Sequence, residues 1–216
     1  MTDTTRRIEG IAAPLNIANL DTDQIMPKQF LRGIDKAGLD RGLLWDLRFH
    51  GDGRPREDFV LNRREFAGTR VLIAGPNFGC GSSREHAVWG LQQYGIRAVI
   101  ASSFGEIFYS NAMNNRLLAV MLPEGEVQAL MREASDRSEP LRIEIDVKRM
   151  TVRTSRRTSP FVMSPRHRTM VLEGLDMIGA SLQHRAEIDA FAQAHWARQP
   201  WLRDVAARTR QRLERR

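Results

Sequence analysis

Three short apolar runs with helical stretches between them constrain the fold more than any other feature of this sequence. The runs are "TRVLIAG" (69–75), "RAVIAS" (97–102) and "LLAVML" (117–122), and the stretches between them, about 83–94 and 104–115, have helical character. Strands and helices that alternate at these lengths are typical of a parallel sheet with right-handed crossovers. The sequence therefore predicts an α/β domain.

Further predicted elements flank this central pattern on both sides. Residues 141–147, "LRIEIDV", alternate in polarity like a half-buried strand, and 150–155 would pair with them as a hairpin across Lys148 and Arg149. The other predictions are a strand at 8–12, a loop from Pro14 to Leu31, a partly helical region at 35–48, and helices at 124–134, 165–174 and 185–197.

The composition predicts a globular chain that folds without crosslinks. The chain has 216 residues, 42% of them hydrophobic, and no run approaches the roughly 18 apolar residues of a membrane span. The first ten residues, "MTDTTRRIEG", lack the apolar segment of a secretion signal. With Cys80 as the single cysteine, the chain cannot form an internal disulfide or supply a four-cysteine metal site. We expect a cytoplasmic protein that does not enter a membrane.

The positive charge is concentrated at the C-terminus. The formal net charge is +7, but residues 198–216 hold seven arginines against Asp204 and Glu214, which leaves only +2 for the rest of the chain. A nucleic-acid-binding module needs a basic face on its folded body, so the nearly neutral body disfavours that class. We interpret residues 197–216 as a basic extension, either a solvated helix or a polyanion-binding tail.

The segment "NFGCGSSREH" (77–86) follows the first apolar run and precedes a helix. Ser82 and Glu85 have the spacing of a capping box, which predicts that the helix begins directly after Ser82. A helix N-terminus presents unpaired N–H groups that bind carboxylate or phosphate, and Arg84 adds a forked cation suited to a carboxylate. From these residues alone, two interpretations remain open: a helix cap without further function, or an anion site.

Neighbouring residues of this segment have simpler interpretations. Ser103 and Glu106 repeat the capping-box spacing at the start of the next helix, which shows that the spacing alone does not define a site. His86 would lie on the first helical turn, and we interpret it as a packed or hydrogen-bonded residue. Cys80 could act as a nucleophile, but no partner histidine is identifiable, so we interpret it as a packing residue as well.

Four ordered motifs resemble the small subunits of 3-isopropylmalate dehydratase, relatives of aconitase. The motifs are "LDTDQIMPKQFL" (20–31), "NFGCGSSREHAVWGL" (77–91), "ASSFGEIFYSNAMNNRLLAV" (101–120) and "LEGLDMIGASLQH" (172–184). The resemblance implies a swivelling β/β/α domain like the C-terminal domain of aconitase, here over residues 1–196. It also implies a lyase of leucine biosynthesis that isomerises 2- and 3-isopropylmalate through 2-isopropylmaleate.

The same resemblance implies a second chain and a set of site residues. A large subunit would carry a [4Fe–4S] cluster, so this chain would bind no cofactor of its own and would be active only as part of the pair. Ser82 would be the catalytic base, acting as an alkoxide on a small dicarboxylate. The substrate-binding residues that the resemblance implies are Gly81, Ser83, Arg84, Thr22, Asp23 and Arg32.

Some residues depart from the pattern of the family. Val88 replaces a usual proline, and Gly75-Pro76 replaces a position that is commonly acidic. These departures leave open a related dehydratase for another substituted malate, of the homoaconitate, citraconate or dimethylmalate type. An RNA-binding role for the basic tail is the alternative from a different class of protein.

Overall fold

The computed structural model describes residues 7–31, 36–135 and 139–215. The chain forms two compact units, Met1–Asp176 and Met177–Arg216. The boundary between residues 196 and 197 that we expected from the sequence stays a prediction. The two compact units divide the chain between Asp176 and Met177.

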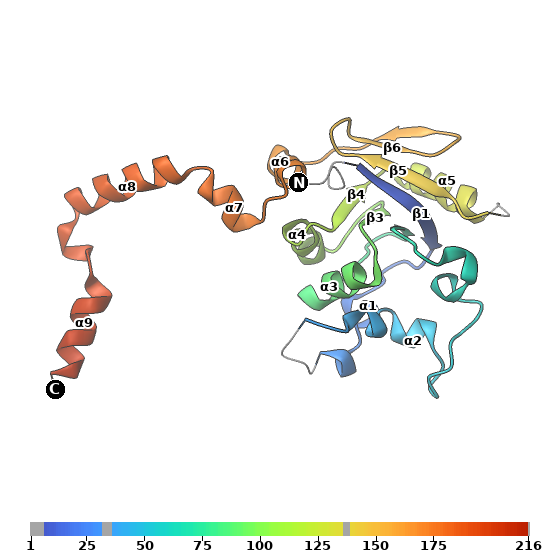
Figure 1. The fold of residues 1–216 in the computed structure, drawn as a ribbon, viewed down its shortest axis with the longest axis horizontal. Helices are drawn as coiled ribbons and strands as arrows, with labels where there is room; N and C mark the ends of the chain where they lie inside the picture. The colour runs from blue at the N-terminus through green and yellow to red at the C-terminus, as the bar shows by residue number, and fades with distance from the viewer. Residues whose placement is uncertain (1–6, 32–35, 136–138, 216) are drawn as a thin grey trace. The chain divides into compact units, whose positions relative to one another are not determined.

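A mixed sheet of seven strands forms the centre of the first unit (Figure 1). Its spatial order is β4-β3-β2-β1-β5-β6-β7. Strands β1 to β4 pair in parallel, whereas β5, β6 and β7 continue from β1 as antiparallel neighbours. The bounds are β1 (Arg7–Leu15), β2 (Val71–Ala74), β3 (Ala98–Ala101), β4 (Leu118–Met121), β5 (Arg142–Asp146), β6 (Thr151–Arg153) and β7 (Thr158–Pro160).

The three apolar runs form the parallel strands as predicted. Every residue of β2 and β3 is buried, because these strands are covered on both faces and so consist of apolar residues throughout. The alternating segment forms β5, in which Ile143 and Ile145 point into the core while the residues between them are less buried. Its hairpin with β6 is confirmed. Strand β7 was not predicted from the sequence.

Helices cover the sheet of the first unit and fill its loops. In Figure 1, α3 and α4 lie on one side of the parallel strands and α5 lies on the other, where it contacts β1, β2 and β3. The predicted helices at 83–94, 104–115, 124–134 and 165–174 are confirmed with small changes in their ends. The bounds are α1 (Thr22–Ile25), α2 (Trp45–Arg48), α3 (Glu85–Tyr94), α4 (Glu106–Asn114), α5 (Glu124–Ser135), α6 (Pro165–Glu173), η2 (Lys28–Phe30), η3 (Leu39–Gly42), η4 (Val60–Asn62) and η5 (Arg64–Phe66).

The second unit is helical throughout. It consists of α7 (Met177–Leu182), α8 (Arg185–Arg198), η6 (Pro200–Leu202) and α9 (Val205–Glu214). None of these helices contains a buried residue. Across the described residues of both units, no helix combines the length and the apolar character needed to cross a membrane.

Candidate functional site

Three loops meet at the carboxyl ends of the parallel strands. The loop after β2 forms one bridge to the loop after β1, between Cys80 and Asp21, and another to the loop after β3, between Phe78 and Phe104. Phe78 is fully buried, and its N–H and carbonyl group bond to the main chain of the loop after β3 over 3.1 and 2.9 Å. Ligands of open parallel sheets bind at this edge, so the loop junction is the candidate site.

The loop after β1 is fastened to the glycine–serine loop by a ladder of hydrogen bonds. The main-chain N–H of Thr22 donates to the carbonyl of Cys80 over 2.9 Å, and the N–H of Gly79 donates to the carbonyl of Leu20 over 2.8 Å. The hydroxyl of Thr22 donates to the carbonyl of Ser82 over 2.8 Å, and the Thr22 residue is only 1% exposed. Thr22 therefore holds the main chain of Ser82 in place from inside the protein.

Gly79 allows the loops to approach this closely. Its φ of 74° lies in the left-handed region, and a side chain there would collide with the ring of Phe108 on α4. Gly105 faces it from the loop after β3, where an added Cβ would lie 2.6 Å from the carbonyl oxygen of Gly79. The two glycines thus set the distance between the glycine–serine loop and its neighbour.

The predicted capping box at Ser82 is wrong. Helix α3 begins at Glu85, and Arg84 is its N-cap without a side-chain capping bond. The reason is tertiary: the carboxylate of Glu85 accepts a hydrogen bond from the side-chain amide of Asn115 over 2.5 Å instead of turning back to Ser82. The second predicted cap, at Ser103, is wrong for a similar reason, since its hydroxyl accepts from the N–H of Asn77 over 2.8 Å.

The failure of the cap leaves the hydroxyl of Ser82 free for another role. Ser82 and Ser83 are exposed, and neither hydroxyl bonds to any of the residues that the structure describes. Within the same described part of the chain, the N–H groups of Gly81, Ser82 and Ser83 donate no hydrogen bond either. Two hydroxyls and three main-chain donors therefore lie together at the surface of the junction, which suits the binding of an anion.

A charged pair lies next to these donors. The guanidinium of Arg84 contacts the carboxylate of Asp23, and the two side chains are 21% and 40% exposed. The ammonium group of Lys28 lies 4.0 Å from the same carboxylate. Asp23 therefore orients Arg84, whose side chain as a whole stays partly exposed. Arg32, which was also predicted to bind substrate, lies outside the described residues.

A capping box that was not predicted organises the other loop. The carboxylate of Asp21 accepts from the N–H of Gln24 over 2.7 Å, and the side chain of Gln24 accepts from the N–H of Asp21 over 3.1 Å. The Asp-x-x-Gln spacing was the available signal. Cys80 and His86 have the structural roles expected of them: the thiol contacts the carbonyl of Asn19 at 3.4 Å, and the imidazole packs on Trp89.

Two shifted pKa values belong to a cluster on α4 and α6. Burial lowers the pKa of His167 below its usual value, and the nearby charge of Arg166 lowers it further. Burial also raises the pKa of Tyr109, whose ring lies 5.6 Å from that of His167 between centroids. Both effects disfavour the charged form of a partly buried group.

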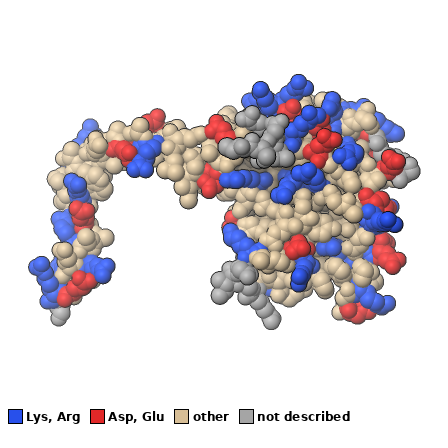
Figure 2. Space-filling view, viewed as in Figure 1, with Lys and Arg blue, Asp and Glu red and all other residues tan. Residues whose placement is uncertain are grey.

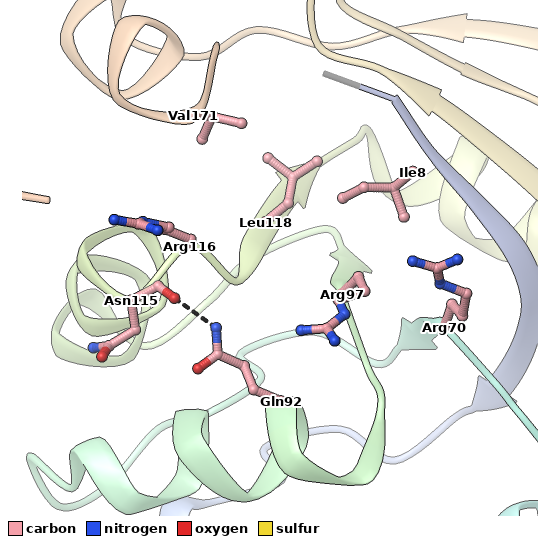
Figure 3. Close-up of a pocket in the computed structure, with 8 residues that line it drawn as sticks. All are labelled: Ile8, Arg70, Gln92, Arg97, Asn115, Arg116, Leu118 and Val171. Carbon is pink, nitrogen blue, oxygen red and sulfur yellow. Dashed lines mark hydrogen bonds between the residues drawn. The ribbon is translucent and has the colours of Figure 1, made fainter. Parts of the chain in front are cut away.

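A pocket of the first unit lies at the opposite ends of the parallel strands. It has a volume of about 440 Å³ and lies at the amino ends of the parallel strands, where Arg70 and Arg97 immediately precede β2 and β3 (Figure 3). None of the residues predicted for the site lines it. The pocket is therefore separate from the glycine–serine loop.

The fold and the loop junction define an aconitase C-terminal domain, and the model of that family matches residues 2–125. A second family model, the C-terminal domain of the 3-isopropylmalate dehydratase small subunit, matches residues 177–205. The chain is 64% identical to 3-isopropylmalate dehydratase small subunit 1 of Chromobacterium violaceum over 96% of its length and 97% of the relative. It belongs to the 3-isopropylmalate dehydratase small-subunit family.

Other relatives agree over similar lengths. A small subunit of Phenylobacterium zucineum is 47% identical over 91% of this chain and 96% of its own. A small subunit of Salmonella typhimurium is 44% identical, with coverages of 95% and 98%. The crystal structure of a 3-isopropylmalate dehydratase from Methanocaldococcus jannaschii superimposes with a TM-score of 0.61 at 28% identity, over 86% of this chain and 99% of the other. The predicted swivel-domain fold is confirmed.

Proposed function

We propose that this chain is the small subunit of a two-chain hydro-lyase that interconverts 2-isopropylmalate and 3-isopropylmalate through 2-isopropylmaleate. The observation that carries the proposal is the loop junction, in a member of this family: two exposed serine hydroxyls and three unpaired N–H groups lie beside an arginine oriented by Asp23. Such a site can bind a carboxylate and stabilise an oxyanion at the same place.

Ser82 acts as the base in this proposal. Its alkoxide removes a proton from the carbon next to one carboxylate, the electron pair of the C–H bond forms the double bond, and the hydroxyl on the neighbouring carbon leaves with its bonding pair. Hydroxide then adds to the carbon that lost its proton, and Ser82 returns its proton to the neighbouring carbon, which restores the alkoxide. A serine hydroxyl is a very weak acid, so the N–H groups around it must stabilise the alkoxide before reaction.

Ser83 and Arg84 hold a carboxylate of the substrate. A guanidinium forms two parallel hydrogen bonds to a carboxylate, which fixes the orientation of the diacid as well as its position. Asp23 positions Arg84, and Thr22 positions Ser82 through its carbonyl group. Gly81, with a φ of 89°, turns the main chain so that the adjacent N–H groups reach the substrate side.

The partner is the large subunit, and it carries a [4Fe–4S] cluster. Such a cluster supplies a Lewis acid for the departing hydroxyl. This chain has one cysteine, and clusters of this kind are held by several thiolates, which supports placing the donors of the cluster on the large subunit. The small subunit contributes the base and the carboxylate site.

Replacing Ser82 tests the proposal. We expect Ser82→Ala to lower kcat of the reconstituted pair by at least about 1,000-fold, equivalent to ~4 kcal/mol of barrier, without changing the affinity for the large subunit. Ser164→Ala is the control, because Ser164 caps α6 through the N–H of His167 and its loss should affect stability alone. Retained turnover in Ser82→Ala would refute the assignment.

A substrate panel tests the specificity. The wild-type pair is assayed anaerobically with isopropylmalate, citramalate and dimethylmalate by the rising absorbance of the alkene diacid, and with homoaconitate by the loss of its alkene absorbance. We expect the highest kcat/KM with isopropylmalate. A higher kcat/KM for another malate would support the proposed chemistry of the site and exclude isopropylmalate as its preferred substrate.

A further inference from the structure

The second unit exposes a large apolar surface and has no core of its own. None of its described residues, 177–215, is buried. Helices of this length gain most of their stability from packing of an apolar face, so this surface needs a covering partner. Of the thirteen large apolar side chains exposed in the described chain, ten lie in this unit: Met177, Ile178, Leu182, Ile188, Phe191, Trp196, Trp201, Leu202, Val205 and Leu213.

Helix α8 carries three of these side chains, spread over a broad arc of the helix rather than gathered on one narrow face. Ile188, Phe191 and Trp196 lie at positions i, i+3 and i+8, and they are 47%, 71% and 38% exposed. His195 lies between the two aromatic rings, 5.8 Å from Phe191 and 4.8 Å from Trp196 between centroids. Exposed aromatic side chains held in one cluster are typical of the energetic centre of a protein–protein interface.

The family relationship indicates what covers this surface. The general aconitase model ends at residue 125, whereas the model that matches residues 177–205 is specific to small subunits. A small subunit has a large subunit as its partner, so a segment specific to small subunits is suited to that contact. We propose that α7, α8 and η6 form a docking surface for the large subunit; this inference rests on the proposed function for the identity of the partner.

The charge of the unit predicts a property of the partner surface. Residues 177–216 contain eight arginines against four carboxylates, and two of those carboxylates are occupied within the helices by Arg185 and Arg210. Figure 2 shows basic side chains gathered toward the C-terminal end and mostly uncharged surface along α7 and α8. Residues 177–202 hold two arginines and two carboxylates, so the large subunit should present an apolar groove to α7, α8 and η6. Acidic side chains are expected only where it faces the basic residues 203–215, and they would accelerate association at low salt.

A double variant of the full chain tests this docking surface. Phe191→Ser with Trp196→Ser should weaken binding of the purified large subunit on the order of 100-fold by calorimetry, because two aromatic anchors are lost. The control is Val162→Ser, which removes an apolar side chain that is 82% exposed on the first unit. At saturating concentrations of the variant, kcat should return to that of wild type, since the loop junction is unchanged.

The outcomes separate this inference from the proposed function. Unchanged affinity in the double variant refutes the docking surface, even where Ser82→Ala abolishes turnover. A wild-type small subunit that dimerises by itself through these two residues also refutes it, because the occupant would be a second copy. A third outcome is that the double variant loses affinity for the large subunit while the wild-type pair does not act on isopropylmalate. That combination supports the docking surface and refutes the proposed reaction.

The pocket at the amino ends of the strands supports a second, independent inference. Its charged lining is entirely basic: Arg70, Arg97 and Arg116 (Figure 3). Within the described residues, none of these three guanidiniums forms an ion pair or a side-chain hydrogen bond. Arg97 and Arg116 are exposed and Arg70 is half-buried, so a pocket of about 440 Å³ is lined by three cations that an anion entering from solvent can reach.

The rest of the lining specifies the kind of anion. Ile8, Leu118 and Val171 form an aliphatic wall opposite the polar groups. The stem of Arg70 is fixed against β1, where a Cβ on Gly10 would lie 2.7 Å from its Cδ atom. We infer that this pocket binds a small carboxylate that carries a short aliphatic group.

Direct binding measurements on the full chain test the pocket. Isovalerate should bind saturably at millimolar concentration, and Arg97→Gln with Arg116→Gln should weaken it at least about tenfold, whereas the exposed Arg132→Gln should not. Absence of saturable binding, or equal binding by the double variant, refutes the site. Inorganic phosphate that binds as tightly as isovalerate refutes the aliphatic part of the assignment.

Discussion

Replacing Thr22 by valine isolates the part that loop positioning plays in the proposed reaction. The side chain is buried, and its hydroxyl donates a 2.8 Å hydrogen bond to the carbonyl of Ser82. Valine keeps the shape and removes only this donor. The carbonyl of Ser82 then retains a single donor, the N–H of Arg84 at 2.8 Å.

The expected cost has two parts. The lost hydrogen bond should lower the free energy of unfolding by about 1–2 kcal/mol, because a carbonyl is left facing a methyl group. For a chain of this size, that corresponds to roughly 2–4 °C in Tm for each kcal/mol. Ser82 also loses one of its two main-chain anchors, and a displacement of ~1 Å at a reacting group can cost up to about 100-fold in rate. We therefore expect kcat to fall by about 10- to 100-fold.

Thr69→Val is the matched control. Thr69 is also 1% exposed, and its hydroxyl donates to the carbonyl of Phe66 over 2.6 Å, but it lies at the start of β2, away from the loop junction. Both variants should lose similar stability in urea unfolding of the small subunit. Only Thr22→Val should lose kcat when assayed with saturating large subunit. Equal rates for the two variants would show that Thr22 merely stabilises the fold.

Three further changes test other parts of the structure. Gly79→Ala should destabilise the first unit by about 2–4 kcal/mol in urea unfolding, through its left-handed backbone and the collision with Phe108; a loss below about 0.5 kcal/mol would contradict this packing. Arg84→Lys should raise KM at least about tenfold in steady-state assays, since an ammonium cannot form the two-pronged contact, and unchanged kinetics would exclude Arg84 as a ligand. Folding lowers the pKa of His167, so the imidazole binds a proton more readily in the unfolded chain, and the free energy of unfolding should fall as the pH drops below about 6.5. His167→Gln should flatten the dependence of the urea midpoint on pH in this range. An unchanged dependence would contradict the lowered pKa.

The parallel half of the sheet was predictable because its strands are buried on both faces. Such strands are continuous apolar runs, which stand out from helices by their length. Strand β7 escaped prediction because "TSP" is short and polar, and it forms only by pairing with β6. Helix α1 was predicted as a loop, since a helix of four residues has no detectable periodicity and depends on the capping box of Asp21 and Gln24.

The site was predictable in its residues and only partly in its contacts. The motif at 77–86 pointed to Ser82 and Arg84, and the resemblance to the family pointed to the loop with Thr22 and Asp23. The hydrogen bond from Thr22 to the carbonyl of Ser82 joins residues sixty positions apart, and no local pattern contains it. The predicted caps failed for the same reason, because long-range partners of Glu85 and Ser103 replaced the local ones.

Strand β1 has a consequence for how the chain is made. It leaves the ribosome before the other six strands of this sheet, yet it pairs in parallel with β2 near residue 71 and antiparallel with β5 near residue 142. The edge that pairs with β2 can close once residue 74 has been synthesised, whereas the edge that pairs with β5 stays open until residue 146. Unpaired apolar strand edges promote aggregation, so the nascent chain should be most prone to aggregate before β5 has emerged.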